Sequence, residues 1–377
     1  MASQAFYIVG GKLKPDVIGQ PEWTHYEKAL VVKGAAASSR LEVLLEYLTP
    51  SSVCAAESNP SILFKAATLH EQEFFLCTQT EALIYRLPDF QQTHYCSLPC
   101  FNDLHHVRPT PAGTLLVAVT GLDLIIETTR EGKVLREWNV HEQETWQRFS
   151  RAEDYRKVVS TKPHLAHPNY VFVHDEEIWA TRFEQRDAVC LTHPERRIDI
   201  GIGGPHDGIV HQQHVYFTTV NGHIVKADLA SGNVVQTFDL NQISGVQGPL
   251  GWCRGLHVVD ENHVIVGFSR LRPTKFRENL AWVKRWTKAG LGIAESVTSK
   301  PTRIALYNLK SGRLLWEMNV EEAGMNAVFS IHPQHSPLEG GPGGVAQGSC
   351  TSSSRLQQIV ARNNTPLTPL KGGISPA

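Results

Sequence analysis

The chain has 377 residues, and its 36 Lys and Arg side chains are nearly balanced by 37 Asp and Glu, for a formal net charge of −1. This balance argues against a protein that holds nucleic acid or an anionic membrane by bulk electrostatics. A hydrophobic fraction of 41% can form a core, and no apolar run approaches the roughly 20 residues that span a bilayer. The N-terminus has neither a basic segment nor a long apolar one, so we expect no secretory signal peptide and a cytoplasmic location. The 18 histidines are the unusual number, one for every two Lys or Arg side chains.

Seven cysteines are scattered along the chain, and most lie inside short apolar runs, as Cys77 and Cys190 do. A free cysteine behaves as a small hydrophobic residue, so these positions indicate buried, reduced thiols. Cys96 and Cys100 have no second pair that would complete a zinc site.

Three apolar runs near the N-terminus, 6–9, 28–32 and 41–48, are predicted strands. Beyond them, short apolar runs separated by Gly, Asp, Asn and Glu clusters are typical of all-β sandwiches, barrels and propellers. Five segments superpose on the turn between their first two strands, and each has the pattern strand, polar turn, strand. These segments cover residues 61–76, 105–117, 167–179, 206–217 and 254–266.

The strands left over at the two ends of the repeat array complete its architecture. The N-terminal strands lack a first strand before them, and the strand predicted over 326–332 lacks partners after it. Joining them makes a sixth unit and removes the free sheet edges. We therefore predict an all-β, six-bladed β-propeller over residues 1–336, closed by strands from both ends, with seven blades as the alternative.

Two insertions and a tail interrupt this pattern. The segment 140–162, between two repeats, is predicted to be helical. The segment 273–299 is predicted to form a basic amphipathic helix, which would cover one face of the propeller as a lid or bind a protein partner or membrane surface. Residues 337–377 are rich in Gly, Ser and Pro, which predicts a disordered tail.

The functional signal lies at the start of the first strand of each repeat. In a propeller these strands line the central channel, so equivalent positions converge at one mouth. The residues there are polar, basic or Gly, whereas positions deeper in the channel are apolar. They are Lys65, His106, Asn169, His206, Gly255 with the adjacent Arg254, and Asn326.

Three interpretations of this ring remain open. A divalent transition metal is one, with His106, His167, His206 and His257 as ligands, since imidazole suits Zn, Fe or Cu. A pocket for a small polar or anionic substrate is the second. The third is a water-filled channel mouth on a non-catalytic propeller that serves as a scaffold for protein partners.

The leading hypothesis is the second, an enzyme that uses histidine acid–base chemistry, with or without a metal. Its residue roles are as follows: His106 and His206 as acid and base, Lys65 and Arg254 as anion anchors, and Asn169 and Asn326 as orienting groups. Cys253 could act as a nucleophile only if Arg254 or His257 lowers its pKa. No G-x-S-x-G, P-loop, G-x-G-x-x-G or H-E-x-x-H motif occurs.

The repeats resemble the NHL/gluconolactonase-like propeller superfamily, most clearly over 208–228 and 255–270. The stretches 252–257 and 267–272 look similar to an uncharacterised bacterial propeller family. The resemblance covers roughly residues 60–335 and implies a six-bladed fold. Gluconolactonase-like enzymes hold a divalent metal with Glu, Asn and Asp side chains at the axis. Only Asn169 and Asn326 match that set, and His and Lys replace the acidic members, so the resemblance does not carry lactonase activity to this chain.

Overall fold

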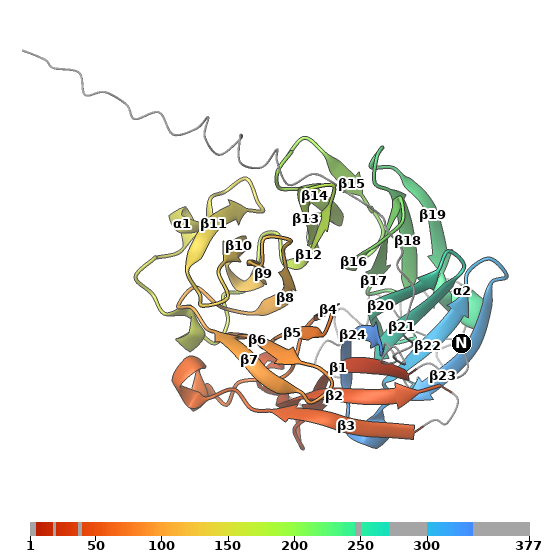
Figure 1. The fold of residues 1–377 in the computed structure, drawn as a ribbon, viewed down its shortest axis with the longest axis horizontal. Coiled ribbons are helices and arrows are strands. Elements are labelled where there is room, and N and C mark those ends of the chain that lie inside the picture. The colour runs from red at the N-terminus through yellow and green to blue at the C-terminus, as the bar shows by residue number, and fades with distance from the viewer. Residues whose placement is uncertain (1–4, 18–19, 37–39, 246–249, 271–299, 335–377) are drawn as a thin grey trace, which may run out of the picture. The chain divides into compact units, whose positions relative to one another are not determined.

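Six antiparallel sheets of four strands surround a central axis (Figure 1). The computed structural model describes residues 5–17, 20–36, 40–245, 250–270 and 300–334. Within these residues the predicted six-bladed propeller is confirmed, and the alternative of seven blades is wrong. No helix in the described part of the chain is long and apolar enough to cross a membrane.

Each sheet contributes one strand to each of four concentric positions (Figure 1). The inner strands are β4 (Thr68–His70), β8 (Leu104–Pro109), β12 (Pro168–His174), β16 (Pro205–His211), β20 (Trp252–Asp260) and β24 (Ala327–Pro333). The second strands are β5 (Glu73–Cys77), β9 (Leu115–Val119), β13 (Glu177–Arg182), β17 (His214–Thr219), β21 (His263–Ser269) and β1 (Ala5–Leu13). The third strands are β6 (Ala82–Arg86), β10 (Leu124–Thr128), β14 (Asp187–Cys190), β18 (His223–Asp228), β22 (Arg303–Asn308) and β2 (Tyr26–Ala35). The outer strands are β7 (Gln91–Cys96), β11 (Val134–Asn139), β15 (Arg197–Asp199), β19 (Val234–Asp239), β23 (Arg313–Asn319) and β3 (Arg40–Tyr47).

One sheet is built from strands that are far apart in the sequence. Its order is β24-β1-β2-β3, and β24 pairs antiparallel with β1, with Ile8 opposite Ile331. The inner strands also touch one another: β12 lies against β8 and β16, and β20 lies against β16 and β24. The six sheets thus form a ring in which each inner strand has neighbours from adjacent blades.

The hydrophobic core is divided into clusters between neighbouring blades. Phe75 and Ile84 of one blade meet Val117 and Ile126 of the next, and equivalent clusters fill the other interfaces. Because blades pack face to face, both faces of the middle strands are buried, and strands such as β9 are continuous apolar runs. The outer strands are largely exposed, as β19 is.

The first insertion is mostly not helical, so that prediction is wrong. Between β11 and β12 the chain forms one α-helical turn, α1, and a short 3-10 turn at Tyr155–Lys157. The apolar side chains Trp146, Phe149 and Tyr155 instead pack on the core between two blades. A helix this short does not recover the free energy that its first turn costs, so the packing of these side chains determines the backbone conformation of the segment. The helical elements are α1 (Thr145–Arg148), α2 (Leu240–Ser244) and 3-10 turns at Glu22–Thr24, Ser51–Val53, Ala56–Ser58, Thr120–Leu122, Tyr155–Lys157 and Glu321–Ala323.

The other two predicted features, the basic helix over 273–299 and the tail over 337–377, lie outside the described residues. The described blades belong to a compact unit that ends at Gln334.

Candidate functional site

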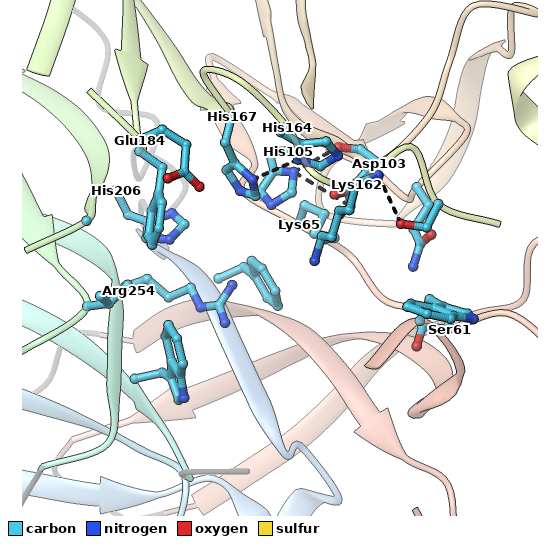
Figure 2. Close-up of a pocket in the computed structure, with 18 of the residues that line it drawn as sticks. Ser61, Lys65, Asp103, His105, Lys162, His164, His167, Glu184, His206 and Arg254 are labelled. Atoms are coloured by element: carbon cyan, nitrogen blue, oxygen red, sulfur yellow. Dashed lines mark hydrogen bonds and ion pairs between the residues drawn. The ribbon is translucent and has the colours of Figure 1, made fainter. Parts of the chain in front are cut away.

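The N-terminal ends of the inner strands, and the segments leading into them, surround a cavity of about 840 Å³ (Figure 2). This volume is in the range of small-molecule sites, roughly 300–1,000 Å³. Every blade contributes to the lining. One lining residue from each is Lys65, His105, His167, His206, Arg254 and Phe329.

Irregular strand pairing turns side chains toward this cavity. In five inner strands the register shifts near the N-terminal end, so that extra residues face a single partner position on the neighbouring strand. A β-bulge of this kind bends the strand and redirects a side chain. The residues left over in the pairing are His105, Asn169, Asp207 with Gly208, Arg254 with Gly255, and Phe329. Three of these, His105, Arg254 and Phe329, line the cavity.

The prediction that His106 faces the central channel is wrong, because a bulge in β8 places its neighbour there instead. His106 is fully buried and is not among the lining residues. Its Nδ1 accepts the backbone N–H of Val171 at 3.1 Å, and its Nε2 lies 3.0 Å from the Thr68 hydroxyl oxygen. Its ring stacks on Tyr170, with centroids 3.7 Å apart. His106 therefore ties β4, β8 and β12 together, and the extra residue His105 takes the place predicted for it at the cavity.

Three other predicted residues also have structural roles away from the lining. The Asn169 side chain is buried, and its Nδ2 donates to the carbonyl of Pro205 at 2.7 Å. The Asn326 Oδ1 accepts the backbone N–H of Leu13 at 3.0 Å, which joins the residue before β24 to the end of β1. His257 packs against Phe6, with ring centroids 6.1 Å apart. None of the three lines the cavity, and β24 contributes Phe329 instead of Asn326.

Positive side chains outnumber carboxylates in the lining. Four are Lys or Arg (Lys65, Lys162, Arg186 and Arg254), against the two carboxylates of Asp103 and Glu184. Lys65 pairs with Asp103 at 3.1 Å. Burial lowers the pKa of Lys65, and the Asp103 carboxylate opposes that effect.

Two of these cations share one aromatic ring. The Lys65 Nζ lies 5.3 Å and the Arg254 guanidinium carbon 4.1 Å from the centroid of Phe329. A ring face attracts cations, and here it holds two positive groups near each other in the lining. The arrangement leaves a local excess of positive charge, suited to an anion.

Histidines form the second component of the lining: His105, His164, His167 and His206. Burial holds the pKa of His105 well below its usual value, and nearby Lys65 adds to this. Burial likewise lowers the pKa of His164, and lowers that of His167 to about 3. These three imidazoles are therefore neutral near pH 7, and each presents one lone pair and one N–H. The His206 ring packs edge-on against Phe183.

A buried carboxylate fixes the loop that carries His167. The side chain of Asp123 accepts the backbone N–H groups of Leu165, Ala166 and His167 at 2.8, 3.0 and 2.8 Å and pairs with Arg148 at 2.8 Å. Burial alone would raise the pKa of Asp123, but Arg148 and these N–H groups outweigh it and lower the pKa. His167 has a left-handed backbone with φ of 53°, which is rare outside Gly and must be held by its surroundings.

Asp207 has a similar supporting role on the other side of the cavity. Its backbone is left-handed, with φ of 63°, and the residue is 3% exposed. Its carboxylate accepts the Thr218 hydroxyl and, at 3.1 Å, the backbone N–H of Gly255. Gly255 lies in the bulge that carries Arg254, so Asp207 braces that bulge. It does not form a dyad with the adjacent His206, since its carboxylate is used toward β17 and β20.

The predicted metal ligands do not come together. Among the residues that the structure describes, no group of three or more His, Cys, Asp or Glu is arranged to hold a metal ion. Of the four predicted ligands, His106 uses both ring nitrogens within the protein and His257 lies outside the lining. The four-histidine set is thus not formed. The Cys253 thiol is buried, and burial raises its pKa well above the usual value, the opposite of what a nucleophile needs.

Comparisons with known proteins support the fold alone. No protein-family model and no curated protein sequence matches the chain at a significant level. Among solved structures, a crystal structure of a protein of unknown function from Bacteroides caccae is similar. It is 13% identical, with a TM-score of 0.54, and the match covers 89% of this chain and 100% of that one. This likeness supports the propeller architecture, and the resemblance to the NHL/gluconolactonase-like superfamily stays a prediction.

Proposed function

We propose that this protein is an enzyme that binds a small anionic substrate in the axial cavity and acts on it by histidine acid–base chemistry. The observation that carries the proposal is the composition of one cavity of about 840 Å³: four Lys or Arg side chains against two carboxylates, beside four imidazoles. Five of these groups are buried, where a polar side chain costs free energy unless it has a partner: Lys65, His105, His164, His206 and Arg254.

The anion anchor is Arg254, supported by Lys65. A guanidinium presents parallel N–H groups that match a carboxylate or phosphate in two-point contact. Lys65, which pairs with Asp103, adds positive potential beside Arg254, since both lie against the Phe329 ring. Figure 2 shows the Arg254 guanidinium extending into the space that Lys65 and the histidines also face.

The base in this proposal is His105, in place of the predicted His106. Its Nδ1 lies 2.8 Å from the backbone carbonyl oxygen of Asp103, which can only accept, so Nδ1 carries the proton and donates it there. A neutral ring protonated on Nδ1 has its lone pair on Nε2. A neutral imidazole with a free lone pair accepts a proton from a substrate hydroxyl or an acidic C–H group. His206, which also lines the cavity, is the proposed acid.

The test begins with binding. Thermal-shift measurements at constant ionic strength would compare gluconate with neutral glucose, malate, inorganic phosphate and glucose 6-phosphate. We expect stabilisation by one or more of the anions, confirmed by calorimetry, and at least about tenfold weaker binding in Arg254→Gln, a loss of about 1.4 kcal/mol. Arg313→Gln, on the exposed outer strand β23, is the matched control and should bind normally.

Turnover is the second stage. The anion that binds is incubated with the protein and followed by proton NMR, and His105→Gln should retain binding but lose turnover. His70→Gln, at the opposite and exposed end of β4, is the control. Absence of anion binding, or binding that Arg254→Gln leaves unchanged, would refute the proposal. That result would favour the alternative, a non-catalytic propeller that recruits protein partners.

A further inference from the structure

We propose that His167 is a second hydrogen-bond acceptor of the cavity and that His164, Thr161 and Asn102 hold it in the tautomer whose lone pair is on Nε2. This inference rests on the proposed acid–base function of the same site. It adds a series of hydrogen bonds, each with a defined donor and acceptor, that ends at His167. Together with His105, this series defines which hydrogen-bonding groups the substrate must have.

The chain begins at Asn102, a buried side chain. Its Nδ2 donates to the backbone carbonyl oxygens of Tyr155 at 2.9 Å and Val158 at 2.8 Å. Two carbonyl partners determine which end of the amide is nitrogen, so the other end is Oδ1, which can only accept. That Oδ1 lies 3.2 Å from the hydroxyl oxygen of Thr161.

Thr161 passes this constraint on to His164. The closest partner of its hydroxyl is the backbone carbonyl oxygen of Gly121, at 2.5 Å. Two oxygens at that separation repel unless a proton lies between them, so Thr161 donates its single proton to a carbonyl. Toward His164, whose Nε2 is 3.3 Å away, the Thr161 oxygen is then an acceptor. His164 therefore carries its proton on Nε2.

The constraint reaches His167 through a contact between two imidazoles. A neutral His164 protonated on Nε2 has its lone pair on Nδ1. That atom lies 2.9 Å from the Nδ1 of His167, so His167 must donate its Nδ1–H (Figure 2, dashed line). A neutral His167 then has its lone pair on Nε2. Burial keeps both rings neutral near pH 7, since it lowers the pKa of each.

Two imidazoles with an acceptor nitrogen each are consequently in contact. The rings of His105 and His167 are in edge-to-face contact with centroids 4.8 Å apart, and both line the cavity. Each carries its lone pair on Nε2, for independent reasons. Groups that accept at two neighbouring points select a ligand that donates at two points, such as a molecule with hydroxyl groups. Together with Arg254, the site is suited to a hydroxylated anion, such as a hydroxy acid or a sugar acid or phosphate.

The neutral His167 ring binds the substrate without changing its own protonation. Its Nε2 lone pair accepts a hydrogen bond from a substrate hydroxyl group, while Arg254 and Lys65 attract the negative charge of the ligand. The Nδ1–H of His167 stays donated to His164, which holds the ring in place. His164 and Thr161 act only through His167 and are positioning residues.

The test reads the tautomers directly and needs no substrate. Long-range proton–nitrogen NMR of histidine-labelled protein distinguishes a protonated from an unprotonated ring nitrogen, and single His→Gln variants assign the signals. We expect His164 protonated on Nε2 and His167 on Nδ1. A His167 protonated on Nε2 in the wild-type protein would overturn the inference.

Single substitutions remove individual hydrogen bonds of this series. His164→Leu removes the acceptor, and we expect the His167 signals to shift toward a mixture of tautomers. His164→Asn places an amide oxygen near the former Nδ1 and should restore the single tautomer. Thr161→Val should shift His164, whereas the exposed Thr237→Val in β19 should shift neither histidine. An unchanged His167 tautomer in His164→Leu, with the fold intact by circular dichroism, would also overturn the inference.

With a substrate in hand, His164→Leu should raise KM at least about tenfold, because an imidazole in the wrong tautomer cannot accept a hydrogen bond from the substrate hydroxyl group. His164→Asn should reverse most of this increase. The tautomer result and the anion-binding result are independent. If the tautomers are as expected but no anion binds, the proposed function fails alone; if anions bind but the tautomers differ, this inference fails alone.

Discussion

The inner strands differ between their N-terminal ends and the residues that follow. At the N-terminal ends the pairing is interrupted by bulges, and left-handed residues such as His167 and Asp207 occur. Further along, the pairing is regular in four of these strands, and the side chains pack. His105 and His106 show the difference within one dipeptide: the bulged residue lines the cavity, and its neighbour hydrogen-bonds inside the protein. The comparison teaches that irregular pairing, and not residue type, selects which histidine lines the cavity.

The largest expected effect is a loss of stability when Asp123, which holds the segment leading into β12, is replaced. Asp123→Asn weakens the acceptor of three backbone N–H groups and leaves Arg148 without its ion pair. Breaking a buried pair on one side costs about 3–5 kcal/mol. Urea unfolding should show a loss of that size. Glu46→Gln, which removes only the exposed pair with Lys28, should cost less than about 1 kcal/mol.

The same carboxylate predicts an acid dependence. Because the pKa of Asp123 is lowered in the folded protein, its stabilising contribution is complete above the unfolded value and is lost as the pH falls. The stability difference between wild type and Asp123→Asn should therefore shrink below about pH 4. A difference that stays constant down to pH 2 would contradict this account.

The second effect concerns Asp207, whose pKa shift, and therefore its effect on stability as the pH changes, is opposite in sign to that of Asp123. Burial raises the pKa of Asp207 to about 6, although Thr218 and the Gly255 N–H oppose it. The folded state therefore binds a proton more tightly than the unfolded state does, and stability falls as the pH rises from about 4 to about 6. The rise from 3.8 corresponds to on the order of 3 kcal/mol. Relative to Asp207→Asn, wild type should lose about this much between pH 4 and pH 7, and a gain instead would refute the assignment.

The third effect tests the adjacent histidines directly. His106→Leu leaves the Val171 N–H without its acceptor, and should cost about 1–3 kcal/mol of stability while anion binding is retained. His105→Gln should do the reverse, with a smaller change in stability and loss of turnover. If His106→Leu abolished turnover in a protein that remains folded, the bulge would not have the role given to it here.

The smallest effect concerns the aromatic ring between the two cations. Phe329→Leu removes the contacts of Lys65 and Arg254 with the ring but retains its apolar volume. Because both cations themselves remain, anion affinity should fall only about two- to fivefold, or about 0.5–1 kcal/mol. Titration calorimetry of the best anion would measure it. A loss as large as that of Arg254→Gln would mean that the ring contacts the ligand itself.

Much of the fold could be predicted from the sequence because its signals are local. Apolar runs and turn residues repeat at each blade, and the unpaired strands at the two ends predicted a shared sheet, in which β24 pairs with β1. The failed prediction in the fold, a helix over 140–162, has a tertiary cause: Trp146, Phe149 and Tyr155 are used for packing against the blades.

The site was predicted only in part. The sequence placed Lys65, His167, His206 and Arg254 at one mouth of the channel, and all four line the cavity. It missed three lining residues, His105, His164 and Phe329. It also predicted four residues at the channel mouth that do not line the cavity: His106, Asn169, Asn326 and His257. A shift of one residue in a strand moves a side chain to the other face, and nothing in the sequence marks which strand has a bulge.

By itself, then, the sequence determined the six-blade architecture and the kinds of group at the axis, since periodicity and composition are properties of neighbouring residues. Which histidine meets the cavity, which nitrogen of it carries the lone pair, and which cations share its walls were decided only by the tertiary structure. The physical reason is that bulges, buried carboxylates such as Asp123, and hydrogen-bond chains such as that from Asn102 to His167 join segments that are far apart in the chain. The surplus of histidines is resolved in the same way: some hold strands together, and others line one cavity.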